Sequence, residues 1–142
     1  MQRMSWYQAL LGKWSCWFSG VAKARTPVSR SAAEQASVDK EANFLTLYEL
    51  RSCHYSAKVR RHLKWLNVAV TSKDLKRCHI YQKELLAGGG RAQVPCLKIE
   101  KPGGNEEWLY ESQDILDYLD RKFAPKSLID TQSAPQQDRR AA

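Results

Sequence analysis

Runs of apolar residues with strand character alternate with helical periodicity through the middle of the chain. Residues 44–48 form a short, β-favouring apolar run, and residues 54–66 place Val59, Leu63 and Leu66 on one helical face. The same patterns predict a strand at 68–71, a helix at 79–87, strands at 94–99 and 108–110, and a final helix ending at Phe123. The element order βαβ-α-ββα predicts an α/β domain with a mixed four-stranded sheet flanked by helices, because only the first crossover requires parallel pairing.

Turn and cap residues support these boundaries. Gly88, Gly89 and Gly90 end the helix predicted at 79–87, since glycine adopts a left-handed cap without steric cost. The sequence Pro-Gly-Gly-Asn at 102–105 predicts that the strands on either side of it form a hairpin. Ser112 is a suitable N-cap for the last helix.

The segments on either side of this domain have different compositions. Residues 3–22 carry apolar and aromatic side chains at helical spacing among basic and polar ones, which predicts an amphipathic helix. Residues 23–43 are typical of a linker that ends in a short polar helix near 31–41. The last residues are rich in Gln, Ser and Pro, and we expect them to be disordered. The chain therefore divides into an N-terminal helix and linker (1–43), a compact domain (44–123) and a tail (124–142).

The excess of positive charge is concentrated at the N-terminus. Lys and Arg number 23 against 15 Asp and Glu, a net charge of +8, and residues 1–33 contain no acid. This distribution does not indicate a nucleic-acid-binding surface, so nucleic acid is not an expected partner. Within the domain, no acid occurs from Arg51 to Asn67, and the basic side chains there favour an anionic ligand.

Cys53 is the candidate for chemistry. Four scattered cysteines exclude a disulfide-rich scaffold and a zinc knuckle, and the three histidines show no metal-ligand spacing, so no metal site is predicted. Cys53 follows the first strand and begins the first helix, where unpaired N–H groups and the helix dipole stabilise a thiolate. Arg51 and Lys58 add positive charge. The alternative is a buried cysteine that acts as a small hydrophobic residue.

Three motifs together resemble a known family. Cys53-His54-Tyr55-Ser56 follows a strand, Val94-Pro95 opens a later strand, and Glu111-Ser112-x-Asp114-Ile115 opens the last helix. This combination resembles the glutaredoxin family and equally the N-terminal domain of glutathione transferases. The resemblance covers residues 44–123 and implies a thioredoxin-like fold.

The resemblance also implies a role for each motif. Cys53 would attack a glutathionylated protein or a small mixed disulfide, and Ser56 would hydrogen-bond the thiolate. Pro95 would be cis and would turn the backbone of Val94 toward bound glutathione. Ser112 and the first amides of the last helix would hold the γ-glutamyl carboxylate, with Glu111 near its ammonium. The glutathione-binding residues implied are Arg51, His54, Tyr55, Val94, Pro95, Glu111 and Ser112.

The motif around Cys53 departs from a dithiol glutaredoxin in two positions. His54 stands where the family has proline, and Ser56 stands where it has the resolving cysteine. A two-cysteine disulfide cannot form at this motif, so the monothiol route remains, in which a second glutathione releases the first. Cys96 follows Pro95 directly and is either a substitute resolving thiol or a buried strand residue.

These observations leave three functions to compare. The first is a glutathione-dependent monothiol oxidoreductase of glutaredoxin type, an enzyme with glutathione as its cofactor. The second is a non-catalytic module that holds glutathione, an iron–sulfur cluster shared between two subunits, or a partner protein. The third is a glutathione transferase, which ranks last because only nineteen residues follow Phe123 and transferases add a helical domain there.

The N-terminal segment leaves localisation open. The apolar stripe, basic residues and tryptophans of residues 3–22 are typical of an interfacial membrane helix, and docking on the domain's own surface is the alternative. Features of a secretory signal or a transit peptide are also present. No apolar run approaches the ~20 residues that span a bilayer. We expect a cytoplasmic protein, free or peripheral to a membrane, with organelle targeting not excluded.

Overall fold

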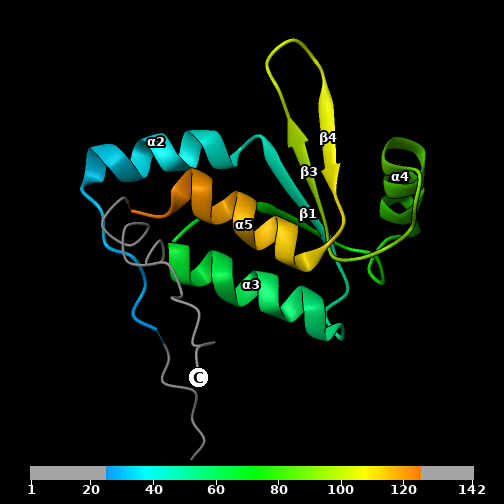
Figure 1. Cartoon of the computed structure of the whole chain (residues 1–142). Coiled ribbons are helices and arrows are strands. Elements are labelled where there is room, and N and C mark those ends of the chain that lie inside the picture. The colour runs from blue at the N-terminus through cyan, green and yellow to red at the C-terminus, as the bar shows by residue number, and fades with distance from the viewer. Residues whose placement is uncertain (1–24, 126–142) are drawn as a thin grey trace, which may run out of the picture.

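The computed structural model describes residues 25–125, which form a four-stranded sheet with helices packed on it (Figure 1). The helices are α2 (Ala32–Ala42), α3 (His54–Leu66), α4 (His79–Gly89) and α5 (Ser112–Phe123); the strands are β1 (Leu45–Glu49), β2 (Thr71–Asp74), β3 (Cys96–Glu100) and β4 (Glu106–Leu109). The strand order is β2-β1-β3-β4. β1 pairs parallel with β2, and β3 pairs antiparallel with both β1 and β4. The predicted mixed sheet is confirmed, and with it the thioredoxin-like fold.

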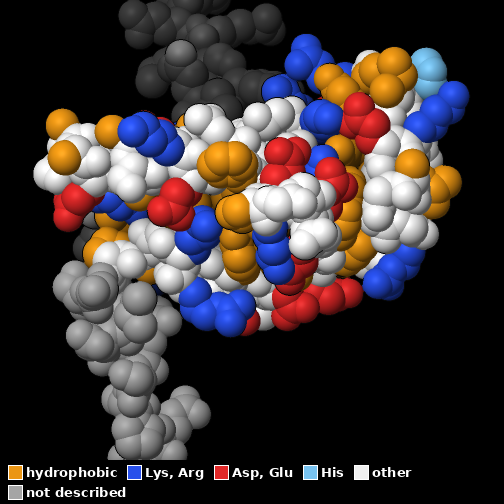
Figure 2. All heavy atoms as spheres, turned by 90° about the horizontal axis from the view of Figure 1, so that it is seen from above, with side chains coloured by type: hydrophobic (Ala, Val, Ile, Leu, Met, Phe, Trp, Pro, Cys, Tyr) orange, Lys and Arg blue, Asp and Glu red, His pale blue; other side chains and the backbone are white. Residues whose placement is uncertain are grey.

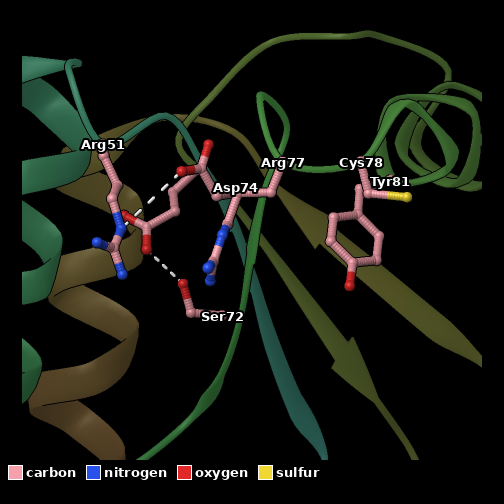
Figure 3. A pocket seen from close by; sticks show the side chains of 7 residues that line it. Arg51, Ser72, Asp74, Arg77, Cys78 and Tyr81 are labelled. Atoms are coloured by element: carbon pink, nitrogen blue, oxygen red, sulfur yellow. Dashed lines mark hydrogen bonds and ion pairs between the residues drawn. The ribbon is translucent and has the colours of Figure 1, made fainter.

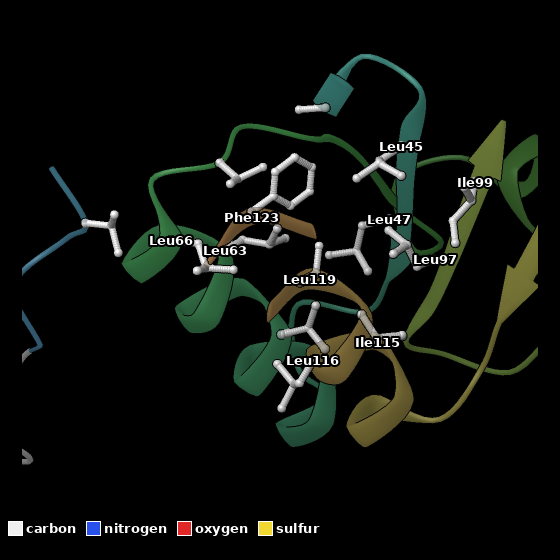
Figure 4. Packing of buried hydrophobic residues seen from close by; sticks show 14 residues of the cluster. Leu45, Leu47, Leu63, Leu66, Leu97, Ile99, Ile115, Leu116, Leu119 and Phe123 are labelled. Carbon is white, nitrogen blue, oxygen red and sulfur yellow. The ribbon is translucent and has the colours of Figure 1, made fainter. Parts of the chain in front are cut away.

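Two clusters of buried side chains attach the helices to opposite faces of the sheet. The larger cluster lies between the sheet and the pair α3 and α5, and it includes Leu47 of β1 and Leu63 of α3 (Figure 4). The smaller cluster joins Tyr48 of β1 to Leu85 of α4. Leu47 and Tyr48 enter different clusters because successive side chains of a strand point to opposite faces. α3 and α5 lie side by side with their N-termini at the same end (Figure 1).

The strand predicted at 68–71 begins too early. The observed β2 is Thr71–Asp74, a polar edge strand whose Thr71 pairs with Thr46. Val68 is buried in the larger cluster, but its N–H donates to the carbonyl of Leu63 at 3.0 Å as part of the end of α3. The apolar signal at residue 68 therefore marks packing behind the helix end and not a strand.

The last turn of α4 contains two of the glycines that were predicted to end it. The helix continues through Gly89, and Gly90 with φ of 78° is its C-cap. A Cβ on Gly88 would lie 2.3 Å from a ring carbon of Trp108, and one on Gly89 would lie 1.8 Å from Oη of Tyr110. These two glycines allow α4 to approach β4 and the residue after it.

The described part of the predicted linker packs against the domain. α2 begins after Ser31, which forms a capping box with Glu34. Val28 is buried in the larger cluster, and its N–H donates to the carbonyl of Trp65 at 2.8 Å. The domain's packing thus extends to residues before 44. The predicted helix at 3–22 and most of the predicted tail lie outside the described residues. Within residues 25–125, no helix is long and apolar enough to cross a membrane.

The visible surface mixes charges of both signs. In the view of Figure 2, basic and acidic side chains alternate over the described residues. On the β3–β4 hairpin, Lys98 lies 2.7 Å from a carboxylate oxygen of Glu106, and Lys101 lies 2.7 Å from one of Glu107. This face carries no continuous basic patch.

Candidate functional site

Cys53 occupies the N-cap of α3, at the turn that follows β1. Its φ and ψ of −80° and 126° are extended, its carbonyl accepts from the N–H of Ala57 at 3.0 Å, and its side chain is partly exposed. The pKa of the Cys53 thiol is lowered. The largest cause is the backbone N–H of Ser56, followed by the Ser56 hydroxyl, the N–H of Tyr55 and the charge of Arg60, while burial opposes them. A thiolate is therefore favoured at the start of α3, as the sequence predicts.

Ser56 is the buried polar residue of this turn. Its side chain is fully buried, and its hydroxyl contributes to the lowered pKa of Cys53. The N–H of Leu50 donates to the same oxygen at 3.5 Å. The serine in the place of a resolving cysteine is thus bonded to the end of β1 and helps to lower the pKa of the Cys53 thiol.

Arg60 is the charged residue that acts on Cys53, whereas the sequence singled out Arg51 and Lys58. The guanidinium of Arg60 donates to the buried carboxylate of Glu49, which also accepts from the Ser72 hydroxyl. A second nitrogen of Arg60 donates to the carbonyl of Arg51 at 3.3 Å. The sequence places Arg60 among the basic residues around Cys53 but does not single it out, because its helical position is typical of a solvent-exposed residue. The carboxylate that orients it, Glu49, lies on β1 eleven residues earlier.

The side chains of Arg51 and Lys58 contact residues other than Cys53. Arg51 is exposed and lies 3.9 Å from a carboxylate oxygen of Asp74. It lines a hollow of about 290 Å³ at the end of β1 and β2 (Figure 3). Lys58 Nζ donates to Oε1 of Gln113 at 3.3 Å. The hollow is lined by Glu49, Arg51, Ser72, Asp74, Arg77, Cys78 and Tyr81.

The strand register brings the other two motifs to the same end of the sheet. Tyr48 pairs with Cys96, so Pro95 lies beside the end of β1 and the turn that leads to Cys53. Leu97 pairs with Leu109, so β4 also ends there and α5 starts three residues later. The three motifs, which are far apart in sequence, therefore surround one edge of the domain.

The backbone at these motifs is suited to hold a ligand. The Val94–Pro95 peptide bond is cis, Pro95 is buried and Val94 is partly exposed. Glu111, and not Ser112 as predicted, is the N-cap of α5, and no side chain caps this helix. Ser112 is the first helical residue, since Glu111 is the last residue with extended φ and ψ. The first amides of α5 thus lack a side-chain acceptor at the cap.

His54 and Tyr55 lie at the rim of the site. Both side chains are exposed, and their rings meet edge to face with centroids 5.9 Å apart. The contribution of Tyr55 to the pKa of Cys53 comes from its backbone N–H.

The remaining described cysteines differ in exposure. Cys96 is fully buried beside Tyr110, and burial raises the pKa of its thiol to about 12. Burial therefore favours the interpretation of Cys96 as a strand residue over that of a resolving thiol. Cys78 is partly exposed at the N-cap of α4. Over residues 25–125, no group of three or more His, Cys, Asp or Glu is placed to hold a metal ion, which gives no support to the iron–sulfur alternative.

Residues 47–127 match a family model described as glutathione S-transferase, N-terminal domain, which covers more than half of the chain. The chain belongs to this family. Its resemblance to the transferase N-terminal domain is therefore confirmed, and its fold is the thioredoxin-like fold of that domain.

Solved structures of both kinds are similar to the chain. An epsilon-class glutathione S-transferase from the housefly Musca domestica is 26% identical, over 60% of this chain and 40% of that chain, with a TM-score of 0.45. Maleylacetoacetate isomerase from Anaeromyxobacter dehalogenans, with bound glutathione, is 24% identical over 58% and 38%, with a TM-score of 0.44. Glutaredoxin C1 from Populus tremula x tremuloides is 17% identical over 70% and 97%, with a TM-score of 0.43.

The chain spans about two fifths of the length of the transferase and the isomerase that it matches. No curated protein sequence matches it.

Proposed function

We propose that this protein is a glutathione-dependent thiol–disulfide oxidoreductase that acts through Cys53 by a monothiol route. The observation that carries the proposal is the position of Cys53, partly exposed at the N-cap of α3, where the N–H of Ser56 is the largest cause of its lowered pKa. Thiolate is the nucleophilic form of cysteine, and a partly exposed thiolate can reach a disulfide in solution. Family membership supports glutathione as the co-substrate.

The reaction has two exchange steps. In the first, the Cys53 thiolate attacks the glutathione sulfur of a disulfide R–S–S–G, forming a Cys53–glutathione disulfide and releasing R–S⁻, which takes a proton from water. In the second, the thiolate of another glutathione attacks the glutathione sulfur of this adduct. Oxidised glutathione leaves, and the Cys53 thiolate is regenerated. No second protein cysteine takes part, which is consistent with a serine at position 56.

The groups around Cys53 would hold the tripeptide of the adduct. The backbone of Val94 would pair with it as a short strand. The first amides of α5 and the hydroxyl of Ser112 would bind the γ-glutamyl carboxylate, and Glu111 would face its ammonium. The exposed side chains of His54 and Tyr55 at the rim, and of Arg51 in the turn before Cys53, would contact the rest of the tripeptide.

An adduct measurement tests the proposal. After exposure to oxidised glutathione, intact mass should increase by one glutathione in wild type and in Cys78→Ser, and the increase should be absent in Cys53→Ser. Wild type should also reduce a small glutathionylated disulfide with glutathione as the reductant, and Cys53→Ser should not. An adduct that persists in Cys53→Ser, or no adduct in wild type, would contradict the proposal.

The family match favours one second candidate, a transferase-type reaction. In that reaction the site would bind reduced glutathione, and the glutathione sulfur itself would attack an electrophile. A small aromatic electrophile distinguishes the two functions. Formation of a glutathione conjugate without any disulfide reduction would favour the transferase.

A further inference from the structure

The guanidinium of Arg30 joins the C-terminal ends of α3 and α5, the two helices that begin at the site. Arg30 Nη1 donates to the carbonyl of Leu66, the last residue of α3, at 2.7 Å. Its Nη2 donates to the carbonyl of Phe123, the last residue of α5, at 2.6 Å. The last four carbonyls of a helix have no partner within the helix, and a positive charge is favourable there. Arg30 therefore caps both helices at once.

Two side-chain contacts join α3 and α5 nearer to the site. His62 Nε2 lies 2.7 Å from Oδ1 of Asp120, about two thirds of the way along each helix. Lys58 Nζ reaches Oε1 of Gln113 at 3.3 Å, close to the helix N-termini. Both contacts depend on flexible side chains from each helix. Arg30, in contrast, bonds directly to the backbone of both, so its position is tied to the position of each helix along its axis.

A helix is stiff along its axis, because every residue adds a rise of 1.5 Å and is hydrogen-bonded to the next turn. A slide of α5 against α3 at their C-terminal ends is therefore transmitted to their N-terminal ends. Those ends carry Cys53 on α3 and Glu111 with Ser112 on α5. The distance between the two ends is the distance that a single glutathione would have to bridge, from its sulfur to its γ-glutamyl carboxylate.

We propose that Arg30 is a positioning residue, which sets the offset between α3 and α5 and thereby the separation of the two halves of the glutathione site. The inference rests on the proposed function, which assigns glutathione to these helix N-termini. Arginine suits the role because its planar fork presents several N–H groups in fixed directions, whereas a lysine ammonium is a single point charge.

The backbone around Arg30 is held in place independently of its guanidinium. The N–H of Val28 is bonded to the carbonyl of Trp65, and Arg25 lies over the Trp65 ring with its Cζ 4.9 Å from the centroid. Next to Arg30, the backbone N–H of Ser31 donates to Oε2 of Glu34 at 3.0 Å. Replacing Arg30 should therefore remove the bridge without releasing the segment.

Arg30→Lys and Arg30→Ala test the role by steady-state kinetics with a small glutathionylated disulfide. We expect KM to rise by about tenfold with little change in kcat, because misplaced binding groups weaken productive binding of the substrate. The pH midpoint of Cys53 alkylation should stay at the wild-type value, since the N–H groups that lower its pKa belong to α3 itself.

Two matched variants separate positioning from stability. Val28→Ala removes buried methyl groups from the same segment, and Lys122→Met removes the 3.1 Å ion pair between α5 and Glu41 of α2. Both keep the Arg30 bridge, so their KM should stay within about twofold of wild type. An unchanged KM in folded Arg30→Lys, or an equal rise in Val28→Ala at matched thermal stability, would overturn the inference.

Amide NMR spectra give a readout that does not depend on glutathione. Arg30→Lys should move the N–H signals of Ser56 and Gln113, at the N-terminal ends of α3 and α5, while Lys122→Met should not. If wild type forms no adduct and these signals move, the proposed function fails and the offset set by Arg30 stands. If wild type turns over and the signals stay in place, the Arg30 inference alone fails.

Discussion

In Gly89→Ala, helix propensity and tertiary packing should change the free energy of unfolding in opposite directions. Gly89 lies in the last turn of α4, where alanine would be favoured over glycine by about 1 kcal/mol from helix propensity alone. In this structure, however, a Cβ would lie 1.8 Å from Oη and 2.9 Å from Cζ of Tyr110, and 3.1 Å from a ring carbon of Trp108. The tyrosine or the helix would have to move.

Movement of Tyr110 has identifiable costs. Its hydroxyl donates to the carbonyl of Arg91 at 3.1 Å, and its ring stacks beneath the Arg91 guanidinium, whose Cζ is 4.8 Å from the ring centroid. Overpacking costs typically 1–3 kcal/mol, and a lost hydrogen bond adds roughly 1 kcal/mol. After the gain from helix propensity, we expect Gly89→Ala to lower the free energy of unfolding by about 1–3 kcal/mol.

Urea unfolding followed by tryptophan fluorescence measures this change. Tyr110→Phe removes the atom nearest to the new methyl, so the double variant should recover part of the loss that the two single variants predict together. Gly90→Ala is the steric control, because no atom lies within 4 Å of its Cβ and its only cost is the positive φ of 78°. A Gly89→Ala protein more stable than wild type would refute the argument and show that α4 does not pack tightly on Tyr110.

Two further predictions concern thiol chemistry. Because hydrogen bonds to the thiolate lower the pKa of Cys53, its alkylation should proceed at a pH below that needed for an ordinary thiol. Ser56→Ala should move the pH midpoint of this alkylation upward. Equal midpoints in wild type and Ser56→Ala would show that Ser56 does not act on the Cys53 thiol. Burial raises the pKa of Cys96 to about 12, so its proton is retained in the folded state above the pH at which an unfolded thiol loses it. The contribution of Cys96 to stability is then lost as pH rises towards about 12. Alkylation of Cys96 near pH 9 should require denaturant, and an alkylated Cys96 peptide in a mass map of the native protein would contradict this prediction.

Elements with a strong periodic pattern were predicted well from sequence. α3 begins and ends as predicted, at residues 54 and 66, because its apolar face and the placement of Cys53 at its start are both local features. The mixed sheet and its hairpin followed from the crossover and the Pro-Gly-Gly-Asn turn. The three site motifs lie at one edge of the domain, as the resemblance implied, because the strand register carries them there.

The errors arose where a partner distant in sequence decides the structure. β2 was placed too early because Val68 is apolar for packing, while the polar residues of an edge strand give no apolar signal. The position of Arg60 depends on Glu49, and the continuation of α4 through two glycines depends on Trp108 and Tyr110. These dependencies exist only after the chain has folded, so composition and periodicity do not reveal them.

The docking of residues 25–43 bears on how the chain can be shortened. A truncated protein beginning at residue 44, where the sequence suggests the domain starts, would uncover the larger cluster at the positions of Val28 and Ala42. It would also leave the terminal carbonyls of α3 and α5 without the donor they share. Such a fragment should therefore be less soluble and more easily digested by proteases than one that starts before residue 25, even though its sheet and its Cys53 motif would be intact.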